Sequence, residues 1–400
     1  HESTGLSMSA VGGWPHVISF MGQTERTNVT SVVCLAFLDA ANAHPRSLTF
    51  GVELLGGVGA FSFGKMRNAH ARFPALRDVV VEVDGNYGSV VPGLQLLLPQ
   101  LASFTSITEL NLRWQGLVPF PASLFALTEL KKLDLSGNNF VALPDAIGDL
   151  TELTFLSVGC NNLTALPNKL GALIGLTELM AHDNYLATLP DSIAALTQMK
   201  TLDLNRNKFA TLPKAIIKLT SLTELHLMNN QLVALPDSIA ALTQMKTLKL
   251  YDNKFTTLPK PIIKLTRLST LNLNKNQLVT LPDSIAALTA LTELNLNDNP
   301  LATFPKPISK LVSLTKLYLT ATQLATLPNS IAALTKLTKL SLLFNQLVTL
   351  PDAIAALTLL ECLELDLNPL AKPQSAAIET WLASLEAGGC SLSMPDAWYV

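Results

Sequence analysis

The sequence predicts an α/β solenoid, a curved horseshoe in which short parallel strands line the concave face and short helices or 3-10 turns form the convex face. The main observation is a 23-residue pattern, L-x-x-L-x-L-x-x-N-x-L-x-x-L-P-x-x-I-x-x-L-x-x, which occurs twelve times without a slip. A fixed period of this length is the signature of stacked structural repeats. Two further observations are the asparagine and the proline that keep constant places in the pattern. The copies begin at Ile107, Leu130, Leu153, Leu176, Met199, Leu222, Met245, Leu268, Leu291, Leu314, Leu337 and Leu360.

The first segment of the pattern predicts a short strand with one buried face. Its leucines alternate with other residues, as at Leu225 and Leu227, and a period of two places them on the same side of a strand. The chain returns in the same direction once per copy. We therefore expect neighbouring strands to pair in parallel.

The ninth position carries asparagine in ten copies, where the chain must leave the strand and turn inward. Buried backbone at such a turn needs partners, and a carboxamide both donates and accepts hydrogen bonds. We expect a ladder of asparagines that binds the turn backbone of neighbouring repeats. Gln115 and Thr322 interrupt the column, so looser turns are expected there.

The second half of the pattern predicts the convex side. Proline follows leucine, or Phe304 in one copy, from Pro144 to Pro351, and it fixes φ and can open a helical turn. The residues after it read x-x-I-x-x-L, whose i, i+3 spacing fits a short helix or 3-10 turn.

Together these residues resemble the leucine-rich repeat in its 23-residue form, with Leu-Pro-x-x-Ile-x-x-Leu in the second half. That form is seen mainly in intracellular scaffold and receptor proteins. The resemblance covers about two thirds of the chain. It implies a non-enzymatic protein that binds a protein partner on the concave face of the solenoid.

The pattern divides the chain into four regions. Residues 107–370 are the regular solenoid and residues 45–106 hold two irregular long repeats. Their apolar triads at residues 45–50 and 76–81 lie 31 residues apart, and the second lies 31 residues before Ile107. The strand ladder is therefore expected to begin near residue 47.

The two ends are expected to cap the solenoid. Residues 1–44 are predicted to form a helical N-terminal cap of two or three short helices, because apolar residues recur there at three- and four-residue spacing. Residues 371–400 are predicted to hold a capping helix and a tail. Ser375 would be its N-cap, and one face would carry Ile378, Trp381, Leu382 and Leu385.

Residues 14–50 are also similar to a degenerate F-box, with Ser-Phe-Met, a polar turn, Val-Val-Cys and Phe37. That resemblance implies docking on the adaptor of a cullin ubiquitin ligase, with the solenoid as substrate receptor. The opening Leu-Pro of the family is replaced by Gly-Gly-Trp-Pro at residues 12–15. A plain helical cap is the alternative, and a secreted or surface recognition protein or effector is a third reading.

Composition excludes several classes of function. A net charge of −2 without a basic stripe argues against nucleic acid. Hydrophobic residues make up 48% of the chain, but they recur at solenoid spacing with no run of eighteen, so no membrane span is expected. The glycine-rich residues 57–66 come close to a phosphate-binding loop, but Met66 stands where a hydroxyl would bind Mg²⁺. No cofactor is predicted.

Four widely spaced cysteines lack the paired clusters that close many extracellular leucine-rich solenoids. A reducing compartment, and so a cytoplasmic location, is expected, with secretion as the alternative.

The candidate site lies at the outward positions of the strands, where copies differ while the skeleton stays constant. Aromatic, histidine, methionine and arginine side chains among polar neighbours are typical of protein-recognition surfaces. Unselected variation on a solvated face is the alternative. The predicted central patch is His182, Arg206, His226, Met228, Lys249 and Tyr251, and a second apolar patch is Tyr318, Leu343 and Phe344.

No catalytic motif accompanies these patches, so no enzyme activity is predicted. His182, Asp203 and His226 were the candidates for a metal ion. The two histidines lie two repeats apart, about 10 Å by strand spacing, which is too far for both to bind one ion. No metal site is predicted.

Overall fold

The structure is a computed structural model that describes residues 105–258 and 260–395, with Leu98 and Ala102. It also describes the backbone of four N-terminal strands: β1 (Val17–Ser19), β2 (Val32–Ala36), β3 (Ser47–Glu53) and β4 (Asp78–Val83). The chain divides into two compact units, His1–Met199 and Lys200–Val400. Each unit is described by itself.

The N-terminal unit has a ladder of parallel strands that starts at β3. Within it β3 pairs with β4, and β4 pairs with β5, all in parallel. The register aligns Leu48 with Val79 and Val79 with Leu110. The parallel ladder therefore begins at Ser47, and the strands are aligned as the spacing of the two apolar triads predicts. The ladder continues through β5 (Glu109–Asn111), β6 (Lys132–Asp134), β7 (Phe155–Ser157) and β8 (Glu178–Met180).

The helices expected before β3 are not observed where the structure describes the backbone. β1 and β2 pair antiparallel, and β2 pairs antiparallel with β3. The helix prediction is therefore wrong for these two segments, because their β-branched residues favour a strand and the exposed edge of β3 offers a partner. The rest of residues 1–44 and the glycine-rich residues 57–66 lie outside the described residues. The F-box-like reading stays a prediction.

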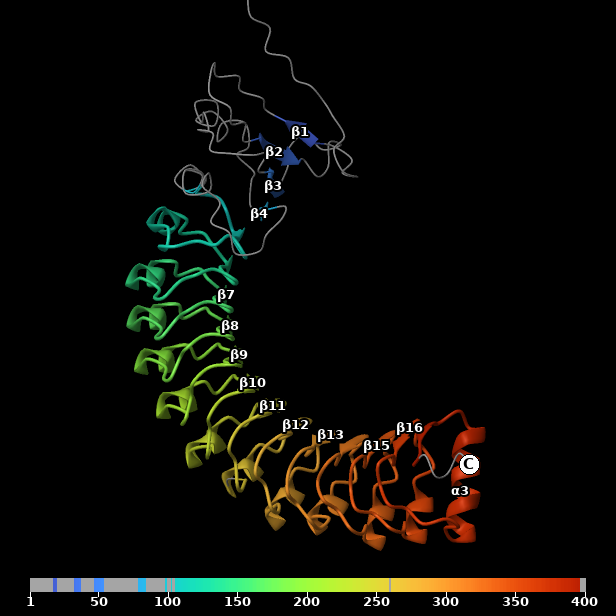
Figure 1. Cartoon of the computed structure of the whole chain (residues 1–400). Coiled ribbons are helices and arrows are strands. Elements are labelled where there is room, and N and C mark those ends of the chain that lie inside the picture. The colour runs from blue at the N-terminus through green and yellow to red at the C-terminus, as the bar shows by residue number, and fades with distance from the viewer. Residues whose placement is uncertain are drawn as a thin grey trace, which may run out of the picture. The chain divides into compact units, whose positions relative to one another are not determined.

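The C-terminal unit is a regular parallel ladder followed by a cap. Each strand pairs with the strand 23 residues further on, as Leu225 does with Leu248. The strands lie along the inner side of this unit and the 3-10 turns along its outer side (Figure 1). The strands are β9 (Thr201–Asp203), β10 (Glu224–His226), β11 (Thr247–Lys249), β12 (Thr270–Asn272), β13 (Glu293–Asn295), β14 (Lys316–Tyr318), β15 (Lys339–Ser341) and β16 (Cys362–Glu364).

The convex segments are 3-10 turns, as the i, i+3 spacing predicts. In η7, Pro236 is extended at φ −66°, and its carbonyl accepts a hydrogen bond from Ile239 N at 3.0 Å. The N-terminal unit has η2 (Ala122–Ala126), η3 (Asp145–Asp149), η4 (Asn168–Ala172) and η5 (Asp191–Ala195). The C-terminal unit has η6 (Lys214–Lys218), η7 (Asp237–Ala241), η8 (Lys260–Lys264), η9 (Asp283–Ala287), η10 (Lys306–Lys310), η11 (Asn329–Ala333) and η12 (Asp352–Ala356).

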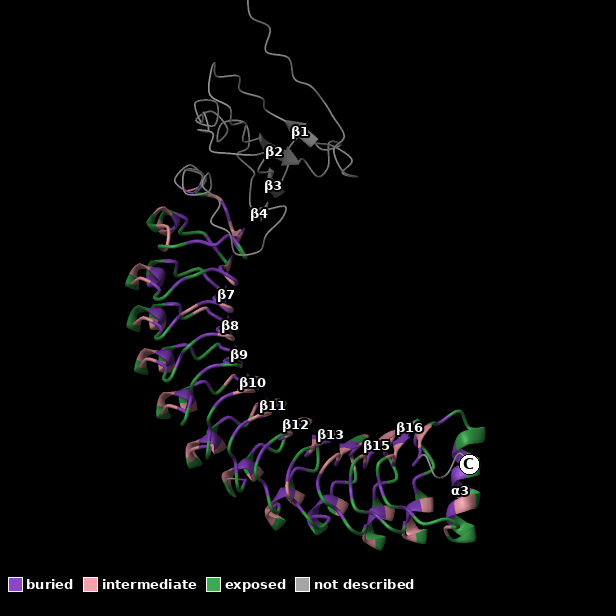
Figure 2. Ribbon diagram, viewed as in Figure 1, coloured by how far each residue is buried: buried purple, intermediate pink, exposed green. Residues whose placement is uncertain are grey.

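The core of each unit is the column of apolar side chains between strands and turns (Figure 2). The leucines and isoleucines of the pattern are almost fully buried there, as are Phe209 and Phe255 at 0% exposure. Burial of this apolar surface on both sides of each repeat is the main stabilising term. A repeat can bury its leucines only against its neighbours.

The asparagine column forms the expected ladder. Asn230 is 9% exposed, and its Oδ1 accepts from Phe209 N of the preceding repeat at 3.1 Å. Its Nδ2 donates to Leu204 O of that repeat at 3.0 Å and to Leu227 O and Met228 O of its own repeat at 3.1 and 3.2 Å. One side chain thus satisfies buried backbone groups in two repeats.

The two residues that interrupt this column do not open their turns to solvent. Gln115 is 2% exposed and Thr322 is fully buried. Thr322 Oγ1 donates to Leu319 O at 2.7 Å. The amide upstream that an asparagine would bind, Leu301 N, donates to Asn299 O at 2.8 Å instead. The turn at Thr322 therefore has a different hydrogen-bond pattern but is not looser, contrary to the expectation from the sequence.

The C-terminal cap contains the predicted helix and one strand that was not predicted. In α3 (Ala376–Ala387), the N-cap Ser375 accepts a hydrogen bond from Ile378 N, and Ile378, Trp381, Leu382 and Leu385 are buried. After α3 the chain returns as β17 (Ser391–Ser393), which pairs in parallel with β16. The edge of β16 is therefore covered. Within the described part of the chain, no helix combines the length and apolar character needed to cross a membrane.

Candidate functional site

In the C-terminal unit, the strand side chains that point away from the core lie on the side of the repeats formed by the strands. Leu225 and Leu227 point into the core at 0% exposure, while the alternating His226 and Met228 are partly exposed. The predicted residues at these positions are therefore placed on an accessible face. We call this strand side of the C-terminal unit its inner face.

The turn that follows each strand has a fixed backbone geometry. The eighth residue of each regular repeat is left-handed, with φ of 50° at Arg206 and 54° at Phe344. A bulky residue in this conformation is uncommon. It projects Phe344 outward at 63% exposure, beside the partly exposed Leu343. The second predicted patch thus contains a large exposed ring.

His226 is less available to a partner than the sequence predicts. It stands between two carboxylates, with Nδ1 at 3.6 Å from Asp203 Oδ2 and Nε2 at 3.6 Å from Glu224 Oε2. Its side chain is only 14% exposed. Asp203, His226 and Lys249 are register partners on three successive strands. The imidazole is therefore largely enclosed by its neighbours and offers little surface to a partner.

Tyr251 belongs to a cluster that the outward positions alone do not reveal. Lys275 Nζ lies 5.9 Å from the centre of the Tyr251 ring and 2.6 Å from Asp252 Oδ2. The hydrogen bond from Lys275 to Asp252 and the charge of that carboxylate raise the pKa of Lys275. The ammonium is thus held over the aromatic ring. We call Tyr251, Lys275 and Asp252 the Tyr251 cluster.

Tyr318 has the same kind of surroundings three repeats further on. Lys339 Nζ lies 5.7 Å from the centre of its ring and 3.0 Å from Glu364 Oε1. The hydrogen bond to Glu364 raises the pKa of Lys339. Burial disfavours ionised Glu364, but hydrogen bonds with Ser341 and Lys339 outweigh it and lower its pKa. Tyr318, Lys339 and Glu364 form the Tyr318 cluster.

Lys275 of the Tyr251 cluster, and Lys339 and Glu364 of the Tyr318 cluster, are not among the residues predicted from the sequence. Lys275 and Asp252 occupy the same position of neighbouring repeats. Lys339 and Glu364 occupy different positions of neighbouring repeats. Opposite charges one repeat apart near an outward tyrosine are the signal that could have found them.

His182 belongs to the N-terminal unit, whereas the other residues of the predicted central patch belong to the C-terminal unit. Its Nδ1 is 3.0 Å from Asp183 Oδ2 and 3.9 Å from Cys160 Sγ. Cys160 is not among the predicted site residues. Arg206, Met228, Lys249 and Tyr251 lie in the C-terminal unit, where Arg206 is exposed and the other three are partly exposed.

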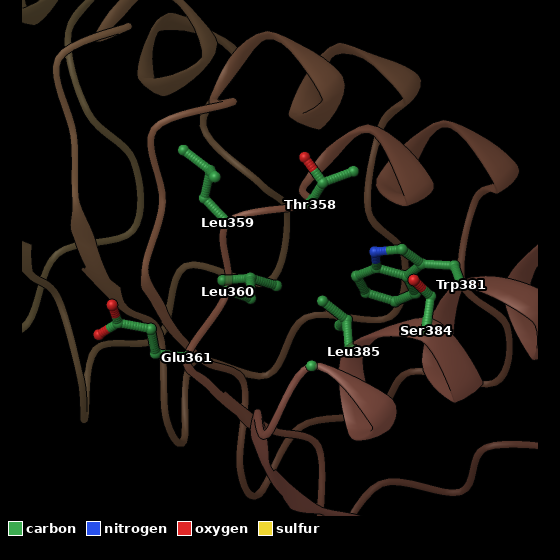
Figure 3. Close-up of a pocket in the computed structure, with 8 residues that line it drawn as sticks. Thr358, Leu359, Leu360, Glu361, Trp381, Ser384 and Leu385 are labelled. Atoms are coloured by element: carbon green, nitrogen blue, oxygen red, sulfur yellow. The ribbon is translucent and has the colours of Figure 1, made fainter.

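A pocket of about 220 Å³ lies between the last repeat and the cap (Figure 3). Trp381, Ser384 and Leu385 of α3 line one side, and Thr358 to Glu361 line the other. Trp381 Nε1 donates to Leu357 O at 3.3 Å across this seam. The pocket is the incompletely filled junction of the cap with the solenoid.

Comparison with known proteins identifies the family. Leucine-rich repeat profiles match residues 174–232 and 243–301, and a second leucine-rich repeat profile matches residues 129–150. A solved leucine-rich repeat protein of Leptospira interrogans is 31% identical, with a TM-score of 0.63 over 82% of this chain and 92% of that chain. The chain therefore belongs to the leucine-rich repeat family. Neither profile describes a catalytic family.

Other solved structures share the fold. An internalin of Listeria monocytogenes is 24% identical over 77% of this chain and 84% of that chain, with a TM-score of 0.65. The plant peptide hormone receptor RGFR1, solved in complex with RGF2, is 25% identical over 74% of this chain, with a TM-score of 0.59. This chain spans about half of that receptor chain, 52%. No curated protein sequence matches.

Proposed function

We propose that this protein is a non-enzymatic recognition module that binds an extended polypeptide segment along the inner face of its C-terminal unit. The observation that carries the proposal is the pair of tyrosine clusters. Each places an aromatic ring under a lysine that is itself held by a carboxylate.

Such clusters lower the entropic cost of binding. Tyrosine is enriched among residues that dominate binding energy, because it offers a large apolar face and a polar tip. A side chain that is already held in place loses less freedom when a partner arrives. Tyr251 and Tyr318 are therefore suited to act as anchors, with Lys249 and Arg206 at the polar rim.

The spacing of the clusters suggests the form of the partner. Tyr251 and Tyr318 belong to β11 and β14 or the residues just beyond, three strand spacings apart. That separation is about 14 Å at a strand spacing of ~4.8 Å. An extended chain covers it with about four to five residues. We expect a segment with two apolar or aromatic residues at this interval, the second close to Leu343 and Phe344.

Two relatives support a polypeptide partner. The receptor RGFR1 was solved in complex with RGF2, and a complex named PEPR1–AtPEP1 is 28% identical to this chain over 67% of its length. These partners belong to those proteins. RGFR1 is a plant peptide hormone receptor, and this supports a polypeptide partner for the present chain.

Selection from a random peptide library on the full chain tests the proposal. Selected peptides should bind Tyr251→Ala and Tyr318→Ala at least about 30-fold more weakly than the unchanged protein, the loss typical of an anchor residue. Tyr185→Ala is the matched control, because it removes a tyrosine that is 53% exposed and outside both clusters. Failure to enrich any peptide, or equal binding to all variants, would reject the proposed function.

A further inference from the structure

Three metal-ligating side chains converge in the N-terminal unit, at a place separate from the tyrosine clusters. Cys160 Sγ lies 3.9 Å from His182 Nδ1, and that nitrogen lies 3.0 Å from Asp183 Oδ2. The three donor atoms all lie within 4.8 Å of one another. Each residue is partly exposed, so an ion could reach them from solvent.

The repeat geometry builds this convergence. Cys160 and Asp183 occupy the eighth position of neighbouring repeats, both left-handed with φ of 52° and 53°. Cys160 N donates to His182 O at 2.8 Å, and Asn161 N donates to Asp183 O at 3.2 Å. The turns that carry the ligands are therefore tied to each other through the backbone.

Asparagines of the buried ladder also hydrogen-bond to the backbone of the turns that carry the three ligands. Asn184 Nδ2 donates to His182 O at 3.1 Å, and Asn161 Nδ2 donates to Gly159 O at 3.0 Å. Both asparagines are about 5–6% exposed. A binding site on rigid backbone loses little freedom when it takes up an ion.

Gly159 leaves the space that the imidazole occupies. A Cβ placed on residue 159 would lie 2.6 Å from His182 Nε2 and 2.7 Å from its Cε1. The ring therefore lies directly over this glycine. Any larger residue would push His182 away from Cys160 and Asp183.

The arrangement fits chelation better than nucleophilic catalysis. In a catalytic relay, the nucleophile contacts one ring nitrogen of histidine and the orienting carboxylate contacts the other. Here both Cys160 Sγ and Asp183 Oδ2 approach Nδ1. One nitrogen cannot both take a proton from the thiol and donate one to the carboxylate. Donor atoms that face a common point are what a metal ion requires.

We propose that Cys160, His182 and Asp183 bind a divalent transition metal ion of the Zn²⁺ class. One sulfur, one nitrogen and one oxygen are ligands that suit Zn²⁺, whereas Ca²⁺ and Mg²⁺ prefer all-oxygen sites. Three protein ligands leave a fourth position for water. Binding converts the Cys160 thiol to a thiolate and releases its proton to solvent.

The distances agree with a tetrahedral site after small side-chain rotations. With Zn–S near 2.3 Å and Zn–N or Zn–O near 2.1 Å, tetrahedral ligands lie about 3.4–3.6 Å apart. The observed 3.9 Å and 3.0 Å lie on either side of these values. The third pair, Cys160 Sγ and Asp183 Oδ2, lies within 4.8 Å, and rotation about the two side-chain torsions would have to bring all three atoms to tetrahedral distances.

Titration of the full, reduced and metal-free chain with Co²⁺ tests the site. Co²⁺ substitutes for Zn²⁺ and reports thiolate ligation through a sulfur-to-cobalt charge-transfer band. We expect this band to saturate at one equivalent, to disappear on addition of Zn²⁺ and to persist in excess Ca²⁺ or Mg²⁺. Absence of the band at one equivalent would overturn the proposal.

Variants assign the band to these residues. Cys160→Ser should abolish it, and Asp183→Asn should weaken Co²⁺ affinity roughly 10- to 100-fold, as losses at metal sites usually do. Gly159→Ala should weaken binding without removing a ligand. Cys362→Ser is the matched control, because it removes a thiol of the C-terminal unit and should leave the band intact. A band that survives in Cys160→Ser, or disappears in Cys362→Ser, would place the metal elsewhere and reject the site.

Discussion

The asparagine ladder gives the sharpest prediction for stability. Asn253 is 6% exposed, and its Oδ1 accepts from Leu232 N at 3.0 Å. Its Nδ2 donates to Leu227 O, Leu250 O and Tyr251 O at 2.9, 3.1 and 3.3 Å. Asn253→Ala removes all four hydrogen bonds inside an otherwise intact repeat.

The magnitude follows from which groups lose their only partner. Leu227 O still accepts from Asn230 Nδ2 at 3.1 Å, and Leu250 O still accepts from Asn276 Nδ2 at 3.0 Å. Leu232 N loses its Asn253 acceptor, and a buried unpaired donor costs about 1–3 kcal/mol. The carbonyls of Leu227, Leu250 and Tyr251 each lose one donor, and this adds roughly 1 kcal/mol to the loss of stability. We expect Asn253→Ala to lower local stability by ~2–4 kcal/mol.

The assay must report on this repeat, because a solenoid can unfold repeat by repeat. Amide hydrogen exchange at residue 232 meets that need. A loss of ~2–4 kcal/mol corresponds to exchange that is roughly 30-fold to several hundred-fold faster. Exchange in the first repeats of the N-terminal unit should change little.

The chain supplies its own control for this substitution. Thr322 occupies the ladder position naturally, and its hydroxyl donates to Leu319 O at 2.7 Å. Asn253→Thr should therefore recover about 1 kcal/mol relative to Asn253→Ala. The reasoning is refuted if exchange at residue 232 stays unchanged in Asn253→Ala, or if threonine is no better than alanine.

Three further predictions concern the core, the Tyr318 cluster and the cap. Phe255→Ala should lower the free energy of unfolding by ~3–5 kcal/mol, and Phe255→Leu, which copies the residue of neighbouring repeats, by only ~1 kcal/mol; equal losses in denaturant unfolding would contradict the packing argument. The pKa of Glu364 is lowered from 4.5 and that of Lys339 is raised from 10.5. Their pair should therefore stabilise fully between these values, with the Glu364 contribution lost as pH falls below 4.5 and the Lys339 contribution lost as pH rises above 10.5. Unfolding of Lys339→Met measured against pH should lack the alkaline loss and show a smaller acid loss, because Ser341 still hydrogen-bonds to Glu364; curves parallel to those of the unchanged protein would disprove the pairing. Ser375→Ala should destabilise α3 by ~1 kcal/mol and Ser375→Asn should not, as followed by helical circular dichroism; identical melting of the two variants would contradict the cap.

Spacing alone predicted the regular fold, because each repeat makes its contacts with a copy of itself. Once Leu225 is buried, its equivalent Leu248 must lie beside it, and the register follows. The same reasoning reached the irregular repeats, since Leu48 and Val79 pair as their triads predict. Local pattern was enough wherever the neighbour in space was also the next copy in sequence.

The predictions failed where the partner in space was not set by the repeat. β1 and β2 are strands because they pair along an edge that the local spacing of apolar residues does not reveal. β17 exists because α3 brings the chain back to β16. The tyrosine clusters depend on the conformations of Lys275 and Lys339, which sequence position does not determine.

Hydrogen bonds beneath the inner face connect the fifth position of a repeat with its seventh amide. Where the fifth position is Asp or Asn, its side chain accepts from the seventh amide of the same repeat, as Asn295 does from Asn297 N at 3.1 Å. Tyr318 cannot do so. In its repeat the seventh amide, Thr320 N, donates to Asn297 Oδ1 of the preceding repeat at 2.7 Å.

His226 is a second fifth-position residue whose side chain does not accept a hydrogen bond from the seventh amide of its own repeat. There the seventh amide, Met228 N, donates to Asn205 Oδ1 of the preceding repeat at 2.7 Å. An unpaired amide would cost about 1–3 kcal/mol, so the repeats of His226 and Tyr318 each depend on an asparagine one repeat earlier. The two arrangements are equivalent, with the donor amide and the acceptor asparagine 23 residues apart in each. Asn297→Ala should therefore destabilise the Tyr318 repeat more than Tyr318→Asn does, since asparagine at residue 318 would restore the local acceptor, and hydrogen exchange at residue 320 would show the difference.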